Sequence, residues 1–448
     1  MLPRVRPPAG SLLWRSLRMY QVYGANTEVG KTIFTTLLCK AAKSRQPHEE
    51  TVFLKPVSTG PDNEADENHL LQFAPDISTK TLFQYDLAVS PHIAAEASTS
   101  SIPTDDTLLA RITSFANNQA SRGTGWLFLE TAGGVHSPGP SGTPQADLYT
   151  PLRLPVVLVG DSKLGGISQT ISAFESLKIR GYDVATVLLF AEDTYQNYAY
   201  LTSYFSKHHN IPVFTVPAPP ARDVDRATDI SVMARYYNLN TTSPGVGSTL
   251  AHLISLHAAR LARLDSMRTT AATKIWYPFT QQKHLAPADI TVIDSAHGDY
   301  FHTLSPASPN PTPKANSLLL PTFDASASWW TQGLGHSSPH LALAAASAAG
   351  RYGHVMFASA IHEPALALAE TLLAGMANPR LTRAFFSDNG STGTEVAVKM
   401  ALRAARERYK DWGKGERVGV LGLRGGYHGD TIGAMDCAEP GVFNEKVE

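Results

Sequence analysis

Tyr-Gln-Val-Tyr-Gly-Ala-Asn-Thr-Glu-Val-Gly-Lys-Thr, residues 20–32, is the stretch that decides the fold of the first half of the chain. The apolar run at its start has the length of a buried strand, and Lys31–Ser44 has the length and polarity of a helix. A glycine-rich loop between a strand and a helix is the context of a phosphate-binding loop. Five residues separate Gly24 from Gly30, whereas the usual motif has four.

The chemistry of a phosphate loop survives this extra residue. Backbone N–H groups at the start of a helix face a bound phosphate, and we expect Glu28, Val29 and Gly30 to contribute them. Lys31 supplies a positive charge, and the Thr32 hydroxyl can bind Mg²⁺. The alternative is a glycine-rich helix start that binds nothing, but the strand–loop–helix context favours a nucleotide site.

Short apolar runs alternate with amphipathic stretches from Met19 to about Pro217, which predicts β-α-β units. The further strands expected are Thr51–Leu54, Trp126–Leu129, Pro155–Val159 and Val184–Phe190. The helices expected are Lys31–Ser44, Ser168–Arg180 and Tyr195–His208. The predicted fold class is therefore α/β, with a parallel sheet and flanking helices as in P-loop NTPases.

Three further charged residues are expected at the edge where parallel strands end and ligands bind. Lys55 ends a strand, and beside a phosphate loop its charge could stabilise a transferring phosphoryl group. Glu130 follows the apolar strand at 126–129 and precedes a small-residue turn. Asp66 lies in an acidic stretch, for which the solvated start of a helix is the alternative explanation.

Charge and composition argue against several classes of function. There are 38 Lys and Arg against 39 Asp and Glu, so the net charge of −1 gives no global field for nucleic acid or an anionic membrane. No run approaches the roughly 18 apolar residues of a transmembrane helix. Cys39 and Cys437 match no disulfide or metal spacing. We therefore expect a soluble protein without nucleic-acid or membrane partners.

The N-terminal residues are similar to a mitochondrial presequence. Four arginines and no acidic residue precede Glu28, and Leu12, Leu13, Trp14 and Leu17 could form one apolar helical face. A disordered basic tail on a cytoplasmic protein is the alternative, because early prolines break a helix. In either case residues 1–18 are predicted to be dispensable for the fold.

Two domains are expected after this extension. The periodicity predicts a helix from Ser248 to Ser266, followed by a polar stretch at 268–273. We take that stretch as the boundary between a P-loop domain at 19–267 and a second domain at 274–448. In the second domain we expect helices at Pro339–Arg351, Pro364–Met376 and Gly393–Trp412.

The first domain resembles dethiobiotin synthetase, an ATP-dependent carboxylase of the biotin pathway. The resemblance covers residues 19 to about 240. It rests on the loop at 24–32, Lys55-Pro56-Val57, Ser90-Pro91-His92, Glu130 with Gly133-Gly134, and Lys163-Leu164-Gly165. It implies ATP, CO₂ and 7,8-diaminononanoate as substrates, with carboxylation and closure of the diamine to dethiobiotin.

This resemblance also implies roles for single residues. Lys31 would bind phosphate, and Thr32, Asp66 and Glu130 would hold Mg²⁺. Lys55 would stabilise the carbamate and phosphoryl groups. The diamine site would be lined by Thr59, Gly133 and Gly134, with Lys31, Lys55 and Thr59 as the catalytic set.

Two segments of the second domain indicate another cofactor site. Gly390, Ser391 and Thr392 lie just before a predicted helix, where hydroxyls and backbone N–H groups could hold a phosphate. A plain helix N-cap is the alternative. Tyr427 offers an aromatic face among glycines that permit close approach of a ligand, or it belongs to an ordinary glycine-rich turn.

With Trp329 and Trp330, these segments resemble the N-terminal part of the adenosylmethionine-dependent 7,8-diaminononanoate aminotransferase, a pyridoxal phosphate enzyme of fold type I. The resemblance implies that Gly390, Ser391 and Thr392 bind the cofactor phosphate and that Tyr427 stacks on its ring. Trp329 and Trp330 would line the substrate pocket. The two halves would then catalyse consecutive steps, because the aminotransferase makes the diamine that the synthetase uses.

The family carries its Schiff-base lysine and the acid at the pyridinium nitrogen well downstream of the Tyr427 segment. We therefore expect that the chain as given cannot transaminate. Both families usually form homodimers, so we expect one here. The alternative for the whole chain is a P-loop ATPase that acts as a switch or partner-binding module, with the second half as a docking surface.

Overall fold

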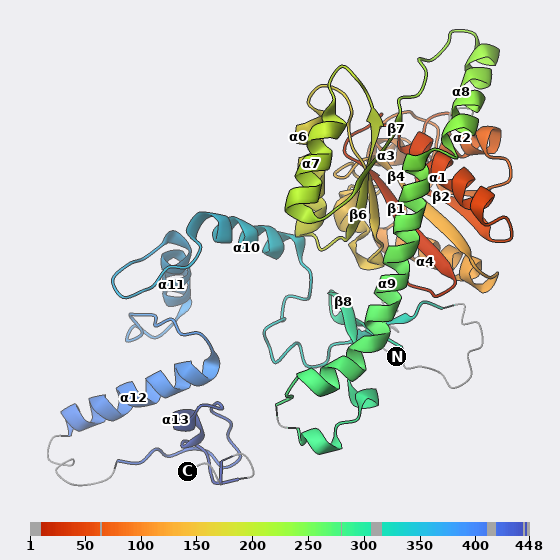
Figure 1. The fold of residues 1–448 in the computed structure, drawn as a ribbon. Helices are drawn as coiled ribbons and strands as arrows, with labels where there is room; N and C mark the ends of the chain where they lie inside the picture. Colours follow the sequence, from red (N-terminus) through yellow and green to blue (C-terminus); the bar gives the residue numbers. More distant parts are fainter. Residues whose placement is uncertain are drawn as a thin grey trace. The chain divides into compact units, whose positions relative to one another are not determined.

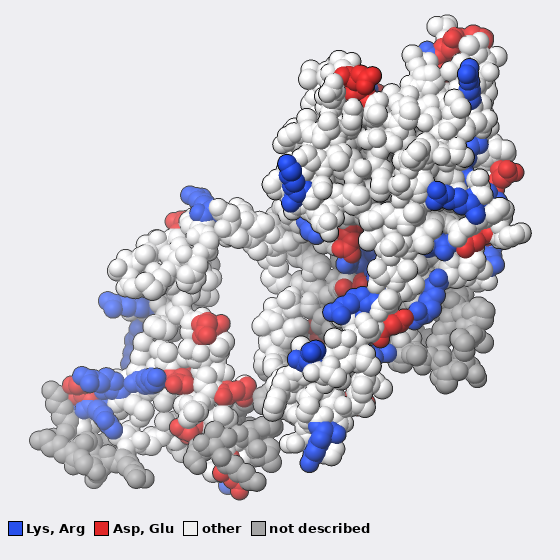
Figure 2. Space-filling model, in the orientation of Figure 1, with Lys and Arg blue, Asp and Glu red and all other residues white. Residues whose placement is uncertain are grey.

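The computed structural model describes residues 10–62, 65–278, 280–305, 316–409, 418–441 and 444–445 (Figure 1). The chain divides into two compact units, Met1–Ala348 and Ala349–Glu448. No helix within these described ranges is long and apolar enough to span a membrane. On the face shown in Figure 2, basic and acidic side chains lie in small groups that alternate in sign.

A seven-stranded parallel sheet forms the centre of the first unit, in the order β3-β2-β4-β1-β5-β6-β7. The strands are β1 (Leu17–Gly24), β2 (Glu50–Thr59), β3 (Ser78–Tyr85), β4 (Gly125–Gly134), β5 (Val156–Val159), β6 (Val184–Ala191) and β7 (Val213–Pro217). The central strands are buried along almost their whole length, because helices cover both faces of the sheet.

The helices pack in two layers, each with its own apolar core. One face of the sheet is covered by α1 (Lys31–Arg45), α2 (Asp66–Phe73), α8 (Arg226–Asn240) and α9 (Pro244–Lys274). The other face is covered by α3 (Pro91–Glu96), α4 (Asp105–Ser121), α5 (Gln145–Leu148), α6 (Gly166–Ile179) and α7 (Asn197–His209). The predicted α/β class with a parallel sheet is confirmed.

Leu12, Leu13, Trp14 and Leu17 are each only 2–4% exposed, so the prediction that residues 1–18 are dispensable is wrong for the part from residue 10 onward. Leu12 and Trp14 belong to the core of the sheet. The Leu12 N–H donates to the Leu152 carbonyl at 2.9 Å, and β1 already begins at Leu17. Residues 1–9 of the predicted extension lie outside the described residues.

Helix α9 runs without interruption through the polar stretch at 268–273, where the sequence predicted a domain boundary. Arg268 donates to the carbonyls of Ile290 and Leu304, so this polar segment faces neighbouring chain and does not end the helix. The neighbour is a small antiparallel sheet of β8 (Ile293–His297), β9 (Tyr300–Leu304) and β10 (Leu319–Phe323). Figure 1 shows α9 continuing from the large sheet to β8.

The second unit is built differently, because its described residues form helices and loops without a strand. It contains α11 (Glu363–Gly375), α12 (Gly390–Arg408) and α13 (Ile432–Met435), while α10 (Pro339–Tyr352) spans the division between the units. Among its described apolar side chains only Ala365, Ala434 and Cys437 are buried. Larger ones such as Leu421 and Met356 are mostly exposed, so this unit has little core of its own.

We expect trypsin to cut the second unit before it cuts the first. Arg380 and Arg383 lie on exposed, non-helical chain between α11 and α12, and few buried contacts oppose local opening there. Timed digestion followed by intact mass spectrometry should show early cleavage after these residues and a persistent fragment that ends beyond α9. Early cleavage within 17–274 would contradict this picture.

Candidate nucleotide and metal site

The predicted phosphate loop lies between β1, which ends at Gly24, and α1, which begins at Lys31. Gly30 has φ +90°, in the left-handed region that favours glycine. A Cβ built on Gly30 would lie 2.4 Å from the Phe190 ring, so a larger residue would collide there. The loop therefore brings backbone N–H groups and the Lys31 side chain to the start of α1.

Four side chains from α1, β2, α2 and β4 meet next to this loop. The Lys55 Nζ lies 2.6 Å from Asp66 Oδ2 and 2.9 Å from Glu130 Oε1. The Thr32 hydroxyl is hydrogen-bonded to Asp66 Oδ1 at 2.8 Å and to Glu130 Oε1 at 2.9 Å. Residues 32, 66 and 130, which the resemblance grouped as metal ligands, thus form one cluster together with Lys55.

Because the cluster is buried, each charged group in it strongly affects the pKa of the others. Glu130 is fully buried, and Lys55 is only 4% exposed. Burial opposes the charge of Lys55, but Asp66 and Glu130 outweigh it and hold its pKa above the usual value. Burial likewise disfavours the charged carboxyl of Asp66, but Lys55, Thr32 and Lys31 hold its pKa below the usual value.

Lys31 differs from Lys55, because no carboxylate of the described residues forms an ion pair with it. Its Nζ is 3.5 Å from the Asn26 carbonyl. Burial, followed by the charge of Lys55, lowers the pKa of Lys31 to about 8, although Glu130 and Asp66 partly offset this. An anion placed at the loop would therefore find a lysine that gains a partner on binding.

The donor set of this cluster suits Mg²⁺. One hydroxyl and two carboxylates are hard oxygen ligands, which Mg²⁺ prefers, and Thr32 directly follows the phosphate-loop lysine. The Lys55 ammonium lies where it contacts both carboxylates. A divalent cation and Lys55 would therefore share the same acidic oxygens.

A cavity of about 350 Å³ adjoins the loop on the side of α6. It is lined by the loop at 25–27, by 134–137 and by residues of α6. Gly133 has φ +67°, and a Cβ on it would lie 2.2 Å from Ser137 Oγ. Gly134 faces the loop itself, since a Cβ on it would lie 3.5 Å from the Ala25 carbonyl oxygen. Thr59, the half-buried last residue of β2, is four residues beyond Lys55.

In the second unit, the structure brings the two predicted cofactor segments together. Asn389 caps α12 by accepting from the Thr392 N–H at 2.9 Å. The Asp430 N–H donates to Ser391 Oγ at 3.0 Å, and the Tyr427 hydroxyl donates to Asp430 at 2.9 Å. Ser391 and the glycine-rich turn are therefore neighbours, and Gly390, at the first position of α12, is exposed.

Both halves of the chain are similar to known proteins. Residues 18–228 match the family model of an AAA domain, and residues 321–444 match that of class-III aminotransferases. A bifunctional dethiobiotin synthetase/adenosylmethionine-8-amino-7-oxononanoate aminotransferase of Emericella nidulans is 55% identical over 446 residues, which are 98% of this chain and 56% of that protein. This chain is a homologue of these bifunctional proteins.

Other relatives agree with this assignment. The bifunctional dethiobiotin synthetase/7,8-diamino-pelargonic acid aminotransferase of Oryza sativa, named as mitochondrial, is 36% identical over 95% of this chain and 57% of its own length. An adenosylmethionine-8-amino-7-oxononanoate aminotransferase of Corynebacterium glutamicum is 42% identical over 26% of this chain and 27% of its own length. The chain spans a little over half the length of its bifunctional homologues.

The structure does not bring every predicted residue into a site. Trp329 and Trp330 are 66% and 84% exposed, on backbone with φ +55° and +69°. Among the described contacts, none joins them to Thr59, Gly133 or Gly134. Their role in a substrate pocket of the aminotransferase half stays a prediction.

Sequence reasoning missed two side chains that hold the cluster and the end of β4 in place. Thr35 donates to Glu130 Oε2 at 2.7 Å and fixes the second oxygen of that carboxylate. The Gln145 Oε1 accepts from the Ala132 N–H at 3.0 Å, and its amide also donates to the Ala132 carbonyl. Thr35 could have been found, because it lies one helical turn after Lys31 and so faces the same strand. Nothing local marks Gln145.

Proposed function

We propose that the first half of this chain uses ATP and Mg²⁺ to carboxylate 7,8-diaminononanoate and close it to dethiobiotin. The observation that carries this proposal is the cluster of Thr32, Lys55, Asp66 and Glu130 beside the loop of Lys31. Such a cluster supplies the two things that phosphoryl transfer needs, which are positioning and charge neutralisation.

The proposed reaction has three steps. One amine of the substrate attacks CO₂ and releases a proton, which gives a carbamate. A carbamate oxygen then attacks the γ-phosphorus of ATP, so that ADP leaves and a carbamic-phosphoric anhydride forms. The second amine attacks the carbamoyl carbon, phosphate leaves, and the ureido ring closes.

The lysines have separate tasks in this proposal. Lys31 binds the nucleotide phosphates, and the added negative charge returns the pKa of Lys31 toward its usual value. Glu28, Val29 and Gly30 contribute loop N–H groups at the start of α1. Lys55 balances negative charge on the carbamate and on the transferring phosphoryl group.

Thr32, Asp66 and Glu130 would hold Mg²⁺, which supplies charge neutralisation on the phosphate oxygens. Because Lys55 contacts both carboxylates, metal binding would weaken its ion pairs and leave its ammonium available to substrate. We propose that Thr59, Gly133 and Gly134 bind the diamine; of these, Gly134 lines the 350 Å³ cavity that adjoins the loop.

For the second half we propose a partial pyridoxal phosphate site. Ser391 and Thr392 carry hydroxyls at the start of the 19-residue helix α12, and the cofactor phosphate would bind there together with Gly390. Tyr427 would stack on the cofactor ring, which supplies the electron sink of transamination. Its segment is already held beside Ser391 through Asp430.

We also propose a mitochondrial location and a homodimer. The plant homologue is named as mitochondrial, and four arginines with no acid precede Glu28. Any processing in this organelle has to spare Leu12, Leu13 and Trp14, since they are core residues. A fluorescent fusion of the full chain and light scattering of the purified protein test the two proposals, and a cytoplasmic signal or a monomer would contradict them.

The deciding experiment measures phosphate release from Mg-ATP and bicarbonate by the full chain, with and without 7,8-diaminononanoate. We expect release that depends on the diamine, with dethiobiotin as product. Release that is indifferent to the diamine would indicate a switch ATPase instead.

Thr32→Val is expected to lower diamine-dependent release by about 10²-fold, because it removes a proposed metal ligand but keeps the shape of the side chain. Thr36→Val is the matched control on the same helix. The Thr36 hydroxyl donates to the Thr32 carbonyl and touches neither carboxylate of the cluster, so release should change little. Equal losses in both variants would contradict the assignment of Thr32.

A further inference from the structure

A cavity of about 610 Å³ lies at the edge of the sheet opposite the phosphate loop. It is lined by the first residues of β1 and β6, by chain just before β5 and β7, and by one side of α9. The N-terminal segment and β8 complete the lining. All of these parts belong to the first unit, and the volume is that of a small-molecule site.

The wall of this cavity is mainly aliphatic. It includes Leu12, Leu13, Leu256, Leu264, Met267 and Ile293. These side chains come from three segments that are far apart in the sequence. The wall is therefore formed by tertiary packing and not by one helix alone. An apolar ligand chain would gain by leaving water here.

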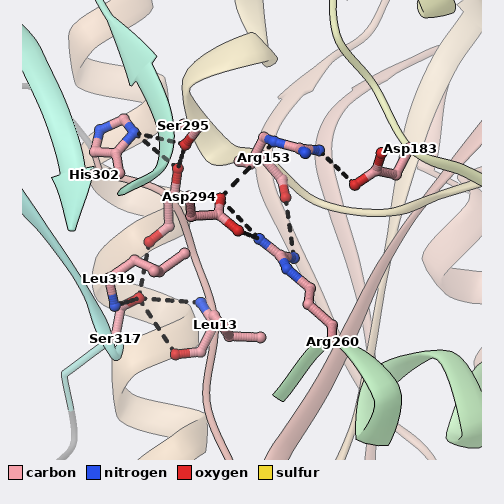
Figure 3. A network of polar contacts seen from close by, with 10 residues as sticks. Leu13, Arg153, Asp183, Arg260, Asp294, Ser295, His302, Ser317 and Leu319 are labelled. Atoms are coloured by element: carbon pink, nitrogen blue, oxygen red, sulfur yellow. Dashed lines mark hydrogen bonds and ion pairs between the residues drawn. The ribbon is translucent and has the colours of Figure 1, made fainter. Parts of the chain in front are cut away.

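Asp183, Arg260 and Asp294 of the lining form an ion-pair network with Arg153, in which the side chains point toward one another (Figure 3). Arg260 contacts both oxygens of Asp294, at 2.9 and 3.1 Å. Arg153 contacts Asp183 at 2.8 Å and Asp294 at 3.9 Å. The two carboxylates of the network are therefore balanced by two guanidinium groups.

Arg263 also lines the cavity, one turn of α9 beyond Arg260. Within the described ranges of the chain, no hydrogen bond or ion pair uses its guanidinium. Arg263 is an exposed residue, so its charge stands at the open rim of the cavity, whereas both acids of the lining are already paired with other arginines. A guanidinium next to an aliphatic wall is suited to a carboxylate that ends an apolar chain.

The two histidines of the lining, His252 and His257, do not alter the net charge of the cavity. His252 is hydrogen-bonded to the Ala185 carbonyl at 3.0 Å. Burial, followed by the charges of Arg18 and Arg260, lowers the pKa of His257 to about 4. His257 is therefore neutral near pH 7, and Arg263 remains the unpaired charge.

We propose that this cavity is a second binding site, for an aliphatic monocarboxylate whose chain lies on the apolar wall and whose carboxylate meets Arg263. The proposal does not depend on the proposed function, because the phosphate loop is at the other edge of the sheet.

Calorimetric titration of the full chain with nonanoate tests this site. We expect saturable binding of one nonanoate per chain, with affinity falling about fourfold for each methylene removed in octanoate and heptanoate. Nonanol and nonylamine should bind at least about tenfold more weakly, because neither carries the negative charge of a carboxylate. Mg-ATP should not compete.

Arg263→Gln is expected to weaken nonanoate binding about tenfold, and Arg263→Lys less. Arg122→Gln is the matched control, because Arg122 is an exposed arginine that does not line the cavity. Ala259→Phe should block binding by filling the cavity while Arg263 is kept. Thermal unfolding of each variant shows that it is folded.

Two results would overturn the site. One is the absence of binding up to about 10 mM nonanoate in the folded protein. The other is binding that Arg263→Gln and Ala259→Phe leave unchanged. Phosphate release is measured separately, so a failure of this site and a failure of the synthetase proposal are distinguishable.

Discussion

Lys55→Met is expected to stop phosphate release and also to destabilise the first unit. Glu130 is fully buried, and Lys55 is the cation that pairs with it. Breaking a buried ion pair by removing one partner costs about 3–5 kcal/mol, because the other charge stays in a medium that solvates it poorly. The urea midpoint of the metal-free protein should therefore fall clearly.

Lys31→Met is the matched comparison and should separate catalysis from stability. Phosphate release is expected to fall about 10²–10³-fold, because the loop loses its charge on the phosphates. The free energy of unfolding should not fall, because burial already disfavours the charged form of Lys31 and no carboxylate in the part of the chain that the structure describes pairs with it. Equal destabilisation by both variants would show that the two lysines do not differ as the geometry indicates.

The lowered pKa of Lys31 also predicts how the stability of the folded protein depends on pH. The pKa of Lys31 is lowered to about 8 in the folded protein from 10.5, so between these values the unfolded chain binds more protons at this position. Raising the pH from 8 should therefore stabilise the nucleotide-free protein, by at most roughly 3 kcal/mol at pH 10.5.

Urea midpoints of the wild type and of Lys31→Met, compared up to about pH 9.5, measure this contribution. The range stops there because tyrosines ionise above it in the unfolded chain. Burial raises the pKa of tyrosines in the folded protein, for example that of Tyr182 to about 12, so their ionisation in the unfolded chain lowers the stability as the pH rises further. The wild type should gain stability relative to the variant as the pH rises. Parallel curves would contradict the lowered pKa of Lys31.

The cluster of Thr32, Lys55, Asp66 and Glu130 could be predicted largely from sequence, because most of its residues lie at positions that the topology fixes. Thr32 begins a helix after a strand, and Lys55 and Glu130 lie on parallel strands that direct their ends to one edge. The pairing among these side chains could not be predicted, since it depends on distances across the sheet. Gln145 was missed for the same reason, because it acts on β4 from another segment.

The packing of the N-terminal segment, in contrast, could not be predicted from the sequence. Arginines mixed with leucines and a tryptophan are typical of a targeting helix, but the same composition suits a strand-like segment that packs on a core. Only the contacts distinguish the two. Arg15 pairs with Asp265 at 2.7 Å, and the Leu318 N–H donates to the Leu13 carbonyl at 2.8 Å, across about 300 residues of sequence.

A chain that begins at Met19 is expected not to fold stably, whereas one that begins at Gly10 should fold as the full chain does. The shorter chain loses Leu12, Leu13, Trp14 and Leu17, all buried. Each such side chain contributes about 1.5–3 kcal/mol, so the loss is comparable with the 5–15 kcal/mol that a typical domain has in total. It also removes the Ser16 carbonyl that accepts from the Gly125 N–H at the start of β4.

Hydrogen exchange of the amides in β1 and β4 measures this effect directly at the strands that the N-terminal segment covers. Protection should be lost in the chain that begins at Met19 and kept in the chain that begins at Gly10. Trp14→Ala in the full chain should lower protection partway, by about 3–5 kcal/mol. If the Met19 chain keeps its protection, the N-terminal segment packs on a core that does not need it, and a processing site at residue 18 becomes compatible with the fold.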